Sequence, residues 1–201
     1  MSSKPRGYFQ KLLIMDSETT GLEFNSIDPS QSTNGNYYQA VSWGLVVLDV
    51  TTMKVVDKLY VEIKWDGKSL WSTKAETVHG LSKDYLAKNG LSEVDAIETI
   101  LNFIFDHFGV DEVVPCGGHN VSTFDIFFMR RLLNKHGVMF KTGNRFVDTN
   151  SIGLACFGTY NSDDLFDQFG IVRDNHNSLE DALACAKVIT ITRKLMNKAL
   201  E

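Results

Sequence analysis

Residues 10–20 read Gln-Lys-Leu-Leu-Ile-Met-Asp-Ser-Glu-Thr-Thr, an apolar run that changes to polar side chains at Asp16. Such a run, followed by turn-forming residues, predicts a buried β-strand over 10–16. Asp16 and Glu18 stand two residues apart at its carboxyl end, so both side chains point to one face if the strand geometry persists. A bare Asp-x-Glu is more often simply a polar strand end. The pair therefore becomes a candidate site only in combination with other signals.

The rest of the chain shows strands first and helices later. Strand-like stretches at 40–50 and 54–64, separated by a few turn residues, predict an antiparallel hairpin. Over 92–108 the apolar residues recur at three- and four-residue steps, which predicts a helix with Ser92 as its N-cap. The remaining expected elements are short helices before His79 and near 82–88, a strand at 112–116, a helix at 123–136, a strand near 145–148 and further helices, the last at 178–199. This order predicts an α/β fold with a mixed sheet and helices on its faces.

Length and composition narrow the class of protein. A chain of 201 residues fits one domain, 1–201, and 43% hydrophobic with 11% aromatic residues allows a sizeable core. Twenty basic against 25 acidic residues give a net charge of −5, which argues against a protein that clamps long duplexes by neutralising phosphates. An enzyme that holds a few nucleotides through bound divalent cations is not excluded, because the ions supply positive charge locally.

The three cysteines are Cys116, Cys156 and Cys185, which are far apart and form no Cys-x-x-Cys pair. We expect buried free thiols, no disulfide partner and a reducing compartment. No signal-like apolar segment follows the first residues, and no apolar run approaches the 18 residues of a membrane span. The expected protein is cytoplasmic and does not enter a membrane.

Two further motifs place acids at element boundaries. Asp125 follows Asn120-Val-Ser-Thr-Phe at the expected start of a helix, where the macrodipole favours an acid. His176 precedes Asp181 by five residues, and Ser178-x-x-Asp181 resembles a capping box. Helix stabilisation alone would explain each motif. Four carboxylates and one histidine arranged as D-x-E, N-x4-D and H-x4-D in chain order form a much more specific combination.

This combination resembles the DEDDh, or DnaQ-like, class of 3′-to-5′ exonucleases over nearly the whole chain. The resemblance is carried by residues 15–22, 118–125 and 176–182, with weaker echoes at 79–81 and 147–149. It implies a ribonuclease H-like domain. That domain has a five-stranded mixed sheet, made of a three-strand antiparallel meander plus two parallel strands, flanked by helices and with the site at the strand ends.

The resemblance also implies a role for each acid. Two divalent ions, Mg²⁺ or Mn²⁺, would stabilise the charge-rich transition state of phosphodiester hydrolysis, and such hard cations prefer oxygen ligands. By similarity, Asp16 would bridge both ions, Glu18 and Asp181 would hold the nucleophile-side ion, and Asp125 would serve the second. His176 would accept a proton from the attacking water, a task suited to histidine.

The substrate contacts that the resemblance implies are Thr19, Thr20, Leu22, His79, Asn120 and Phe124. Phe124 is either a stacking face for a base or an apolar residue packed at a helix start. Asn120 either bonds nearby backbone or faces substrate, and His79 with Gly80 is equally explained as a helix end with a C′ glycine. The stretch 23–38, with Phe24, Tyr37 and Tyr38, is either a strand-guiding surface or an ordinary loop.

The expected activity is hydrolysis of single-stranded 3′ ends, with DNA favoured over RNA and with nucleoside 5′-monophosphates released. The alternative within the enzyme class is an exoribonuclease that trims short oligoribonucleotides or RNA 3′ ends, because no motif reveals recognition of a 2′-hydroxyl. A non-catalytic nucleic-acid-binding module is a third reading. The intact set of four carboxylates and His176 weighs against it. Oligomeric state does not follow from the sequence.

Overall fold

The computed structural model describes residues 9–22, 37–173 and 176–201. The expected element at the start is longer than predicted: its strand continues past Asp16 to Thr19, because it stays paired with the next strand until a register shift after Glu18. The elements in chain order are β1 (Lys11–Thr19), β2 (Ala40–Asp49), β3 (Lys54–Glu62), α1 (Thr73–His79), α2 (Lys83–Asn89), α3 (Glu93–Phe108), β4 (Val114–Gly118), α4 (Asp125–Asn134), β5 (Thr142–Asp148), α5 (Thr149–Phe157), α6 (Ser162–Gln168) and α7 (Ser178–Leu200).

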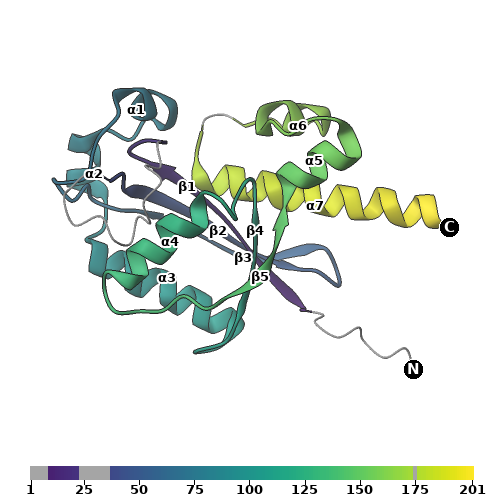
Figure 1. Ribbon diagram of the computed structural model, residues 1–201, viewed down its shortest axis with the longest axis horizontal. Coiled ribbons are helices and arrows are strands. Elements are labelled where there is room, and N and C mark those ends of the chain that lie inside the picture. The colour runs from purple at the N-terminus through teal and green to yellow at the C-terminus, as the bar shows by residue number, and fades with distance from the viewer. Residues whose placement is uncertain (1–8, 23–36, 174–175) are drawn as a thin grey trace.

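The five strands form one mixed sheet in the order β3-β2-β1-β4-β5. β2 pairs antiparallel with both β1 and β3, whereas β4 pairs parallel with both β1 and β5. The predicted five-stranded mixed sheet, a three-strand antiparallel meander plus two parallel strands, is therefore confirmed. Figure 1 shows α1 and α2 grouped beyond the carboxyl end of β1 and the long α7 lying across the sheet.

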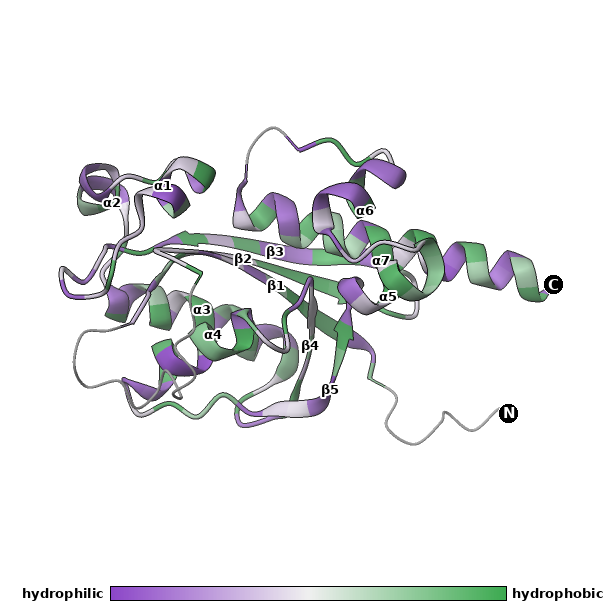
Figure 2. Ribbon diagram, turned by 45° about the horizontal axis from the view of Figure 1, so that its top comes forward, coloured by the Kyte–Doolittle hydropathy of each residue, from purple (hydrophilic) through white to green (hydrophobic). Residues whose placement is uncertain are grey.

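Alternation along β1 divides the core into two layers. Leu13 and Met15 pack with α3 and α4 on one face, and Leu12 and Ile14 pack with α6 and α7 on the other. Figure 2 shows the central strands between α7 on one side and α3 with α4 on the other. All nine residues from Ala40 to Leu48 in β2 are buried, as expected for a strand covered on both faces.

The helix ends confirm some local predictions and correct one. Ser92 caps α3 as predicted, accepting a hydrogen bond from the Asp95 amide. The expected capping box at Ser178 is wrong: Asn177 is the N-cap of α7 and accepts from the amides of Leu179 and Glu180. Ser178 is thereby released from capping, and it makes a tertiary contact described below.

The three cysteines are free thiols, as expected. Cys116 and Cys185 are buried, but Cys156 is exposed, so the expectation of burial is wrong for this residue. Cys156 lies in α5, a short helix on the outside of the sheet, and it is the last residue but one of that helix. Among the described residues, no helix combines the length and the apolar character that crossing a membrane requires.

Candidate active site

Three of the predicted acids converge at the carboxyl end of β1. Asp16 and Glu18 extend from the same face of β1, and Asp181 comes from the first turn of α7. Each offers a carboxylate oxygen, and these oxygens lie within 4.8 Å of one another. Oxygen-only donor sets of this kind suit Mg²⁺ or Mn²⁺. The residues present therefore fit a hard divalent cation.

A glycine in the neighbouring strand lets α7 bring Asp181 into this group. Gly44 stands opposite Asp16 in the β1–β2 register, and a Cβ atom at position 44 would lie only 2.1 Å from the Ser178 carbonyl oxygen. The start of α7 thus rests directly on the backbone of β2. The Ser42 and Ser178 hydroxyls, 2.9 Å apart and buried, add a hydrogen bond between the two elements.

The fourth acid, Asp125, lies on the other face of β1. It begins α4, is 2% exposed, and accepts a hydrogen bond of 2.7 Å from the Ser17 hydroxyl. Ser17 stands between Asp16 and Glu18, so strand alternation turns it away from them and toward α4. Asp125 is nevertheless close enough to Asp16 to exert the largest charge effect on the pKa of that carboxyl. Asp16 is therefore close to Asp125 as well as to Glu18 and Asp181.

Burial and the repulsion between neighbouring carboxylates raise the pKa values of these acids, so they stay protonated at higher pH than ordinary carboxyl groups. Burial, followed by the charges of Asp125, Asp181 and Glu18, raises the pKa of Asp16 well above its ordinary value. Burial first, and then the charges of Asp181 and Asp125, together raise the pKa of Glu18 to about 7. The pKa of Asp125 is raised by burial to about 7 although the Ser17 hydroxyl opposes the rise. Ionising the whole group near neutral pH therefore calls for a compensating cation.

One such cation belongs to the chain itself. The Arg173 guanidinium donates hydrogen bonds to Oδ1 of Asp181 and to Oδ1 of Asp163, and it lies 4.7 Å from the centroid of the Phe166 ring. Its positive charge lowers the pKa values of Asp16 and Glu18. No sequence motif singled out Arg173, because its two partners come from α6 and α7 and only the tertiary fold joins them.

His176, the predicted proton acceptor, is exposed and lies just before α7. Its charge lowers the pKa of Asp181, so the imidazole lies near enough to that carboxylate to affect its ionisation. An exposed imidazole beside the acid cluster is open to both water and substrate. This position is compatible with the proton-accepting role that the resemblance implies.

A cavity of about 250 Å³ opens beside Glu18. Four of the six expected substrate contacts line it, namely Thr19, Leu22, His79 and Phe124. Leu22 projects with 70% of its surface exposed, and Phe124 packs against Phe128 with ring centroids 5.1 Å apart. The cavity is also lined by Tyr38, from the stretch whose role the sequence left open, and by Ser72 and Lys74. Sequence reasoning missed Ser72 and Lys74 because they come from a segment with no recognisable motif.

Two expected contacts are not part of the cavity lining. Thr20 is fully buried, and its hydroxyl accepts a hydrogen bond from the Gln39 amide. Asn120 adopts a left-handed backbone with φ 57°, and its side-chain oxygen accepts from the Thr123 hydroxyl. The Asn120 amide donates to Oδ1 of Asp148, so this residue ties the turn before α4 to the end of β5.

His79 lies at the end of a helix, as one of the two interpretations expected, and it also lines the cavity. It ends α1, and Gly80 with φ 73° follows as the C-cap, donating its amide to the Glu76 carbonyl. The buried imidazole also lines the cavity, and its Nδ1 accepts a hydrogen bond from the Leu81 amide. Burial lowers the pKa of His79, which favours the neutral ring.

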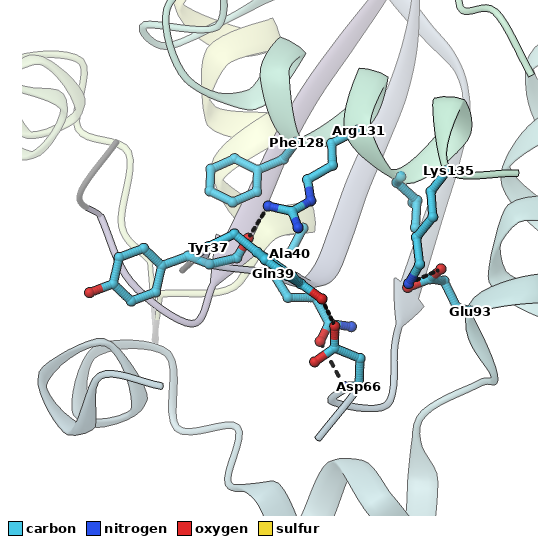
Figure 3. A pocket seen from close by; sticks show the side chains of 10 residues that line it. Tyr37, Gln39, Ala40, Asp66, Glu93, Phe128, Arg131 and Lys135 are labelled. Atoms are coloured by element: carbon cyan, nitrogen blue, oxygen red, sulfur yellow. Dashed lines mark hydrogen bonds and ion pairs between the residues drawn. The ribbon is translucent and has the colours of Figure 1, made fainter. Parts of the chain in front are cut away.

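The residue before Tyr38 in the chain, Tyr37, is held against α4 by Arg131. Phe24 and the rest of 23–36 lie outside the described residues, but Tyr37 and Tyr38 are placed. The Arg131 guanidinium sits 3.2 Å from the Tyr37 ring centroid, and the Tyr37 hydroxyl donates to Asp66. Figure 3 shows this group around a small hollow beneath residues 37–40. Arg131 is thus an anchor for the chain that leads to Tyr38 and the cavity.

No protein-family model matches this chain, and no curated protein matches it in sequence. Solved structures do match. Zinc-bound E. coli exonuclease I in complex with single-stranded DNA superposes with a TM-score of 0.74 and 15% identity, covering 92% of this chain and 41% of that one. Exonuclease I from Methylocaldum szegediense gives a TM-score of 0.69 at 18% identity, covering 92% and 40%. This chain thus spans about two fifths of the exonuclease I chains.

The nuclease domain of 3′hExo, a DEDDh family member bound to rAMP, matches over most of its length. Its TM-score is 0.68 at 10% identity, and the match covers 94% of each chain. At these identities the comparison establishes the fold. The chain has the fold of the DEDDh 3′-to-5′ exonucleases.

Proposed function

We propose that the protein is a metal-dependent 3′-to-5′ exonuclease that removes nucleoside 5′-monophosphates from single-stranded ends. The observation that carries the proposal is the convergence of carboxylate oxygens of Asp16, Glu18 and Asp181 within 4.8 Å of one another, beside a cavity of about 250 Å³ that Glu18 lines. A structural role alone does not account for three acids that repel one another at a strand end. A divalent cation would relieve that repulsion and turn the group into a phosphodiester-cleaving site.

The chain's own residues divide the work as follows. Glu18 and Asp181 would hold the cation on the side of the attacking water, Asp125 would hold a second one, and Asp16 would contact both. Bound divalent ions supply charge stabilisation for the attacking and leaving oxygens. His176 would take the proton from the water as its oxygen bonds to phosphorus. The bond from that phosphorus to the 3′ oxygen of the preceding nucleotide would then break. The leaving oxygen would take a proton from solvent to become a new 3′ hydroxyl, and the terminal nucleoside 5′-monophosphate would be released.

The cavity supports action on a single strand. Leu22 and Phe124 line the cavity and offer apolar surface on which an unpaired base could pack, and the backbone around Thr19 would meet the terminal nucleotide. Charge argues in the same direction, because a chain with a net charge of −5 is poorly suited to holding a long duplex. The similar structures include one exonuclease in complex with single-stranded DNA and one bound to rAMP.

We favour DNA as the substrate, with RNA 3′ ends or short oligoribonucleotides as the alternative. The deciding experiment compares 5′-labelled single-stranded DNA and RNA of the same sequence, each with Mg²⁺, with Mn²⁺ and with a chelator. Ladders that shorten from the 3′ end only when metal is present are the expected result. Faster degradation of RNA than of DNA would establish the alternative, and no shortening of either would reject the proposal.

Variants test the site itself. Asp16→Ala should lower the rate at least about a thousandfold, because removing charge stabilisation at the reacting phosphate costs several kcal/mol. Asp111→Asn is the matched control, since Asp111 is an exposed acid paired with Lys141 on another part of the surface. His176→Ala should lower the rate strongly while Mn²⁺ binding survives. Equal products from wild type and Asp16→Ala would show that the site is elsewhere.

A further inference from the structure

Arg173 is a half-buried cation held between two carboxylates. Its side chain is 14% exposed, and its two guanidinium nitrogens donate separately to Asp181 and Asp163. The guanidinium packs over the face of the buried Phe166 ring. The backbone before it is fixed as well, because the Ile171 amide donates to the Phe166 carbonyl and Ile171 is buried. Arg173 therefore approaches the acid cluster from a defined direction.

Asp181 takes part in two interactions, one with the acid group and one with Arg173. One of its oxygens belongs to the group formed with Asp16 and Glu18, and its Oδ1 accepts from Arg173. A guanidinium and a divalent cation compete for a shared carboxylate, because each forms strong charge-assisted contacts with it and each repels the other. Asp163 differs from Asp181, since its side chain is 59% exposed and it is not a member of the converging group.

We propose that Arg173 takes the place of a cation at Asp181 in the metal-free protein and withdraws to Asp163 when a divalent ion binds. This inference rests on the proposed metal site. Arg173 is then a positioning residue: it neutralises and orients Asp181 while the site is empty. Asp163 and the Phe166 ring retain the guanidinium after it leaves Asp181, so that it stays beside the site.

The exchange has a measurable consequence. A contact that exists in the metal-free state and is broken in the metal-bound state weakens metal binding by its own free energy. Removing Arg173 should therefore tighten metal binding, although it removes a partner of a proposed ligand. The metal-free protein should become less stable at the same time, and saturating metal should abolish that difference in stability.

The test is Mn²⁺ titration by calorimetry on the full chain, with thermal unfolding in chelator and in saturating Mn²⁺. Arg173→Ala should bind Mn²⁺ about tenfold more tightly than wild type, since one charge-assisted contact no longer competes. Arg173→Lys keeps the charge but cannot bridge both acids, so its affinity should lie between those of wild type and Arg173→Ala. Asp163→Asn removes the alternative partner and should weaken Mn²⁺ binding.

A matched control separates contact from general electrostatics. Lys74→Ala removes the same unit of charge from the wall of the cavity beside Glu18. Its Mn²⁺ affinity should stay within about twofold of wild type. Unchanged or weaker binding by Arg173→Ala would overturn the exchange, as would an equal gain in Lys74→Ala. Wild-type protein that binds no Mn²⁺ would instead reject the proposed metal site, and with it this inference, so the two failures are distinguishable.

Discussion

Replacing Gly44 by alanine tests how the site is assembled. The new Cβ atom would lie 2.1 Å from the Ser178 carbonyl oxygen and 2.3 Å from the Leu179 amide nitrogen, both of which are backbone atoms. Reaching an ordinary contact of 3.4 Å requires the start of α7 to move by about 1.3 Å away from β2. Asp181 lies in the same helical turn, and Asp16 faces Gly44 in the register, so the shift separates the two acids.

The expected losses follow from that displacement. Overpacking at this contact should lower the free energy of unfolding by about 1–3 kcal/mol. A shift of about 1 Å in a catalytic group costs roughly a hundredfold in rate, so Gly44→Ala should be far more impaired in turnover than in folding. Thermal unfolding, Mn²⁺ titration and the rate of degradation of labelled single-stranded DNA measure the three effects separately.

Gly143→Ala is the matched control for this substitution. Gly143 is also a strand glycine, in β5, but a Cβ atom there meets nothing nearer than 3.8 Å. That variant should keep wild-type stability within about 0.5 kcal/mol and full activity. If Gly44→Ala kept its rate within threefold of wild type and its Mn²⁺ affinity, the contact between β2 and α7 would not be what positions Asp181.

Three other predictions concern groups already placed. Ser17→Ala leaves buried Asp125 without its hydroxyl donor and should cost about 1–3 kcal/mol in chemical denaturation; an unchanged midpoint would contradict this. In chelator, the raised pKa of Glu18, about 7 against 4.5, means that the folded form keeps a proton that the unfolded chain loses. Glu18 should therefore contribute a fall in stability of about 3 kcal/mol as pH rises from 4.5 through 7, beside the fall that Asp125 contributes in the same range. Glu18→Gln should make the slope less steep, and an equally steep slope in that variant would refute the assignment. One thiol, Cys156, should react with a maleimide in the native protein, and modification of more than one before unfolding would refute the burial of the others.

The elements were predictable because their signals are local. The apolar run of β1, the helical spacing of α3 and the cap at Ser92 each depend on neighbours within a few residues. Predicted ends were less exact, since pairing between strands carried β1 on to Thr19 and began β5 at Thr142 instead of 145. Exposure of Cys156 also escaped sequence reasoning, because it depends on which side of α5 meets the sheet.

The sequence by itself determined which acids would be candidates. Asp16 and Glu18 lie near the carboxyl end of β1, and Asp125 and Asp181 lie in first turns of helices, so local rules placed each near an element end. Tertiary structure decided which of these acids lie together on each face of β1. The alternation of β1 sends Ser17 to Asp125 on one face and leaves Asp16 and Glu18 to meet Asp181 on the other.

Only the tertiary structure revealed what brings Asp181 to that place and what balances its charge. Contact between Gly44 and the start of α7, and the bridge from Arg173 to Asp163 and Asp181, join elements that no local pattern connects. The physical reason is that close backbone approach and charge pairing are set by distances in space. Residue type and spacing along the chain do not determine those distances, because they depend on how the sheet and its helices pack.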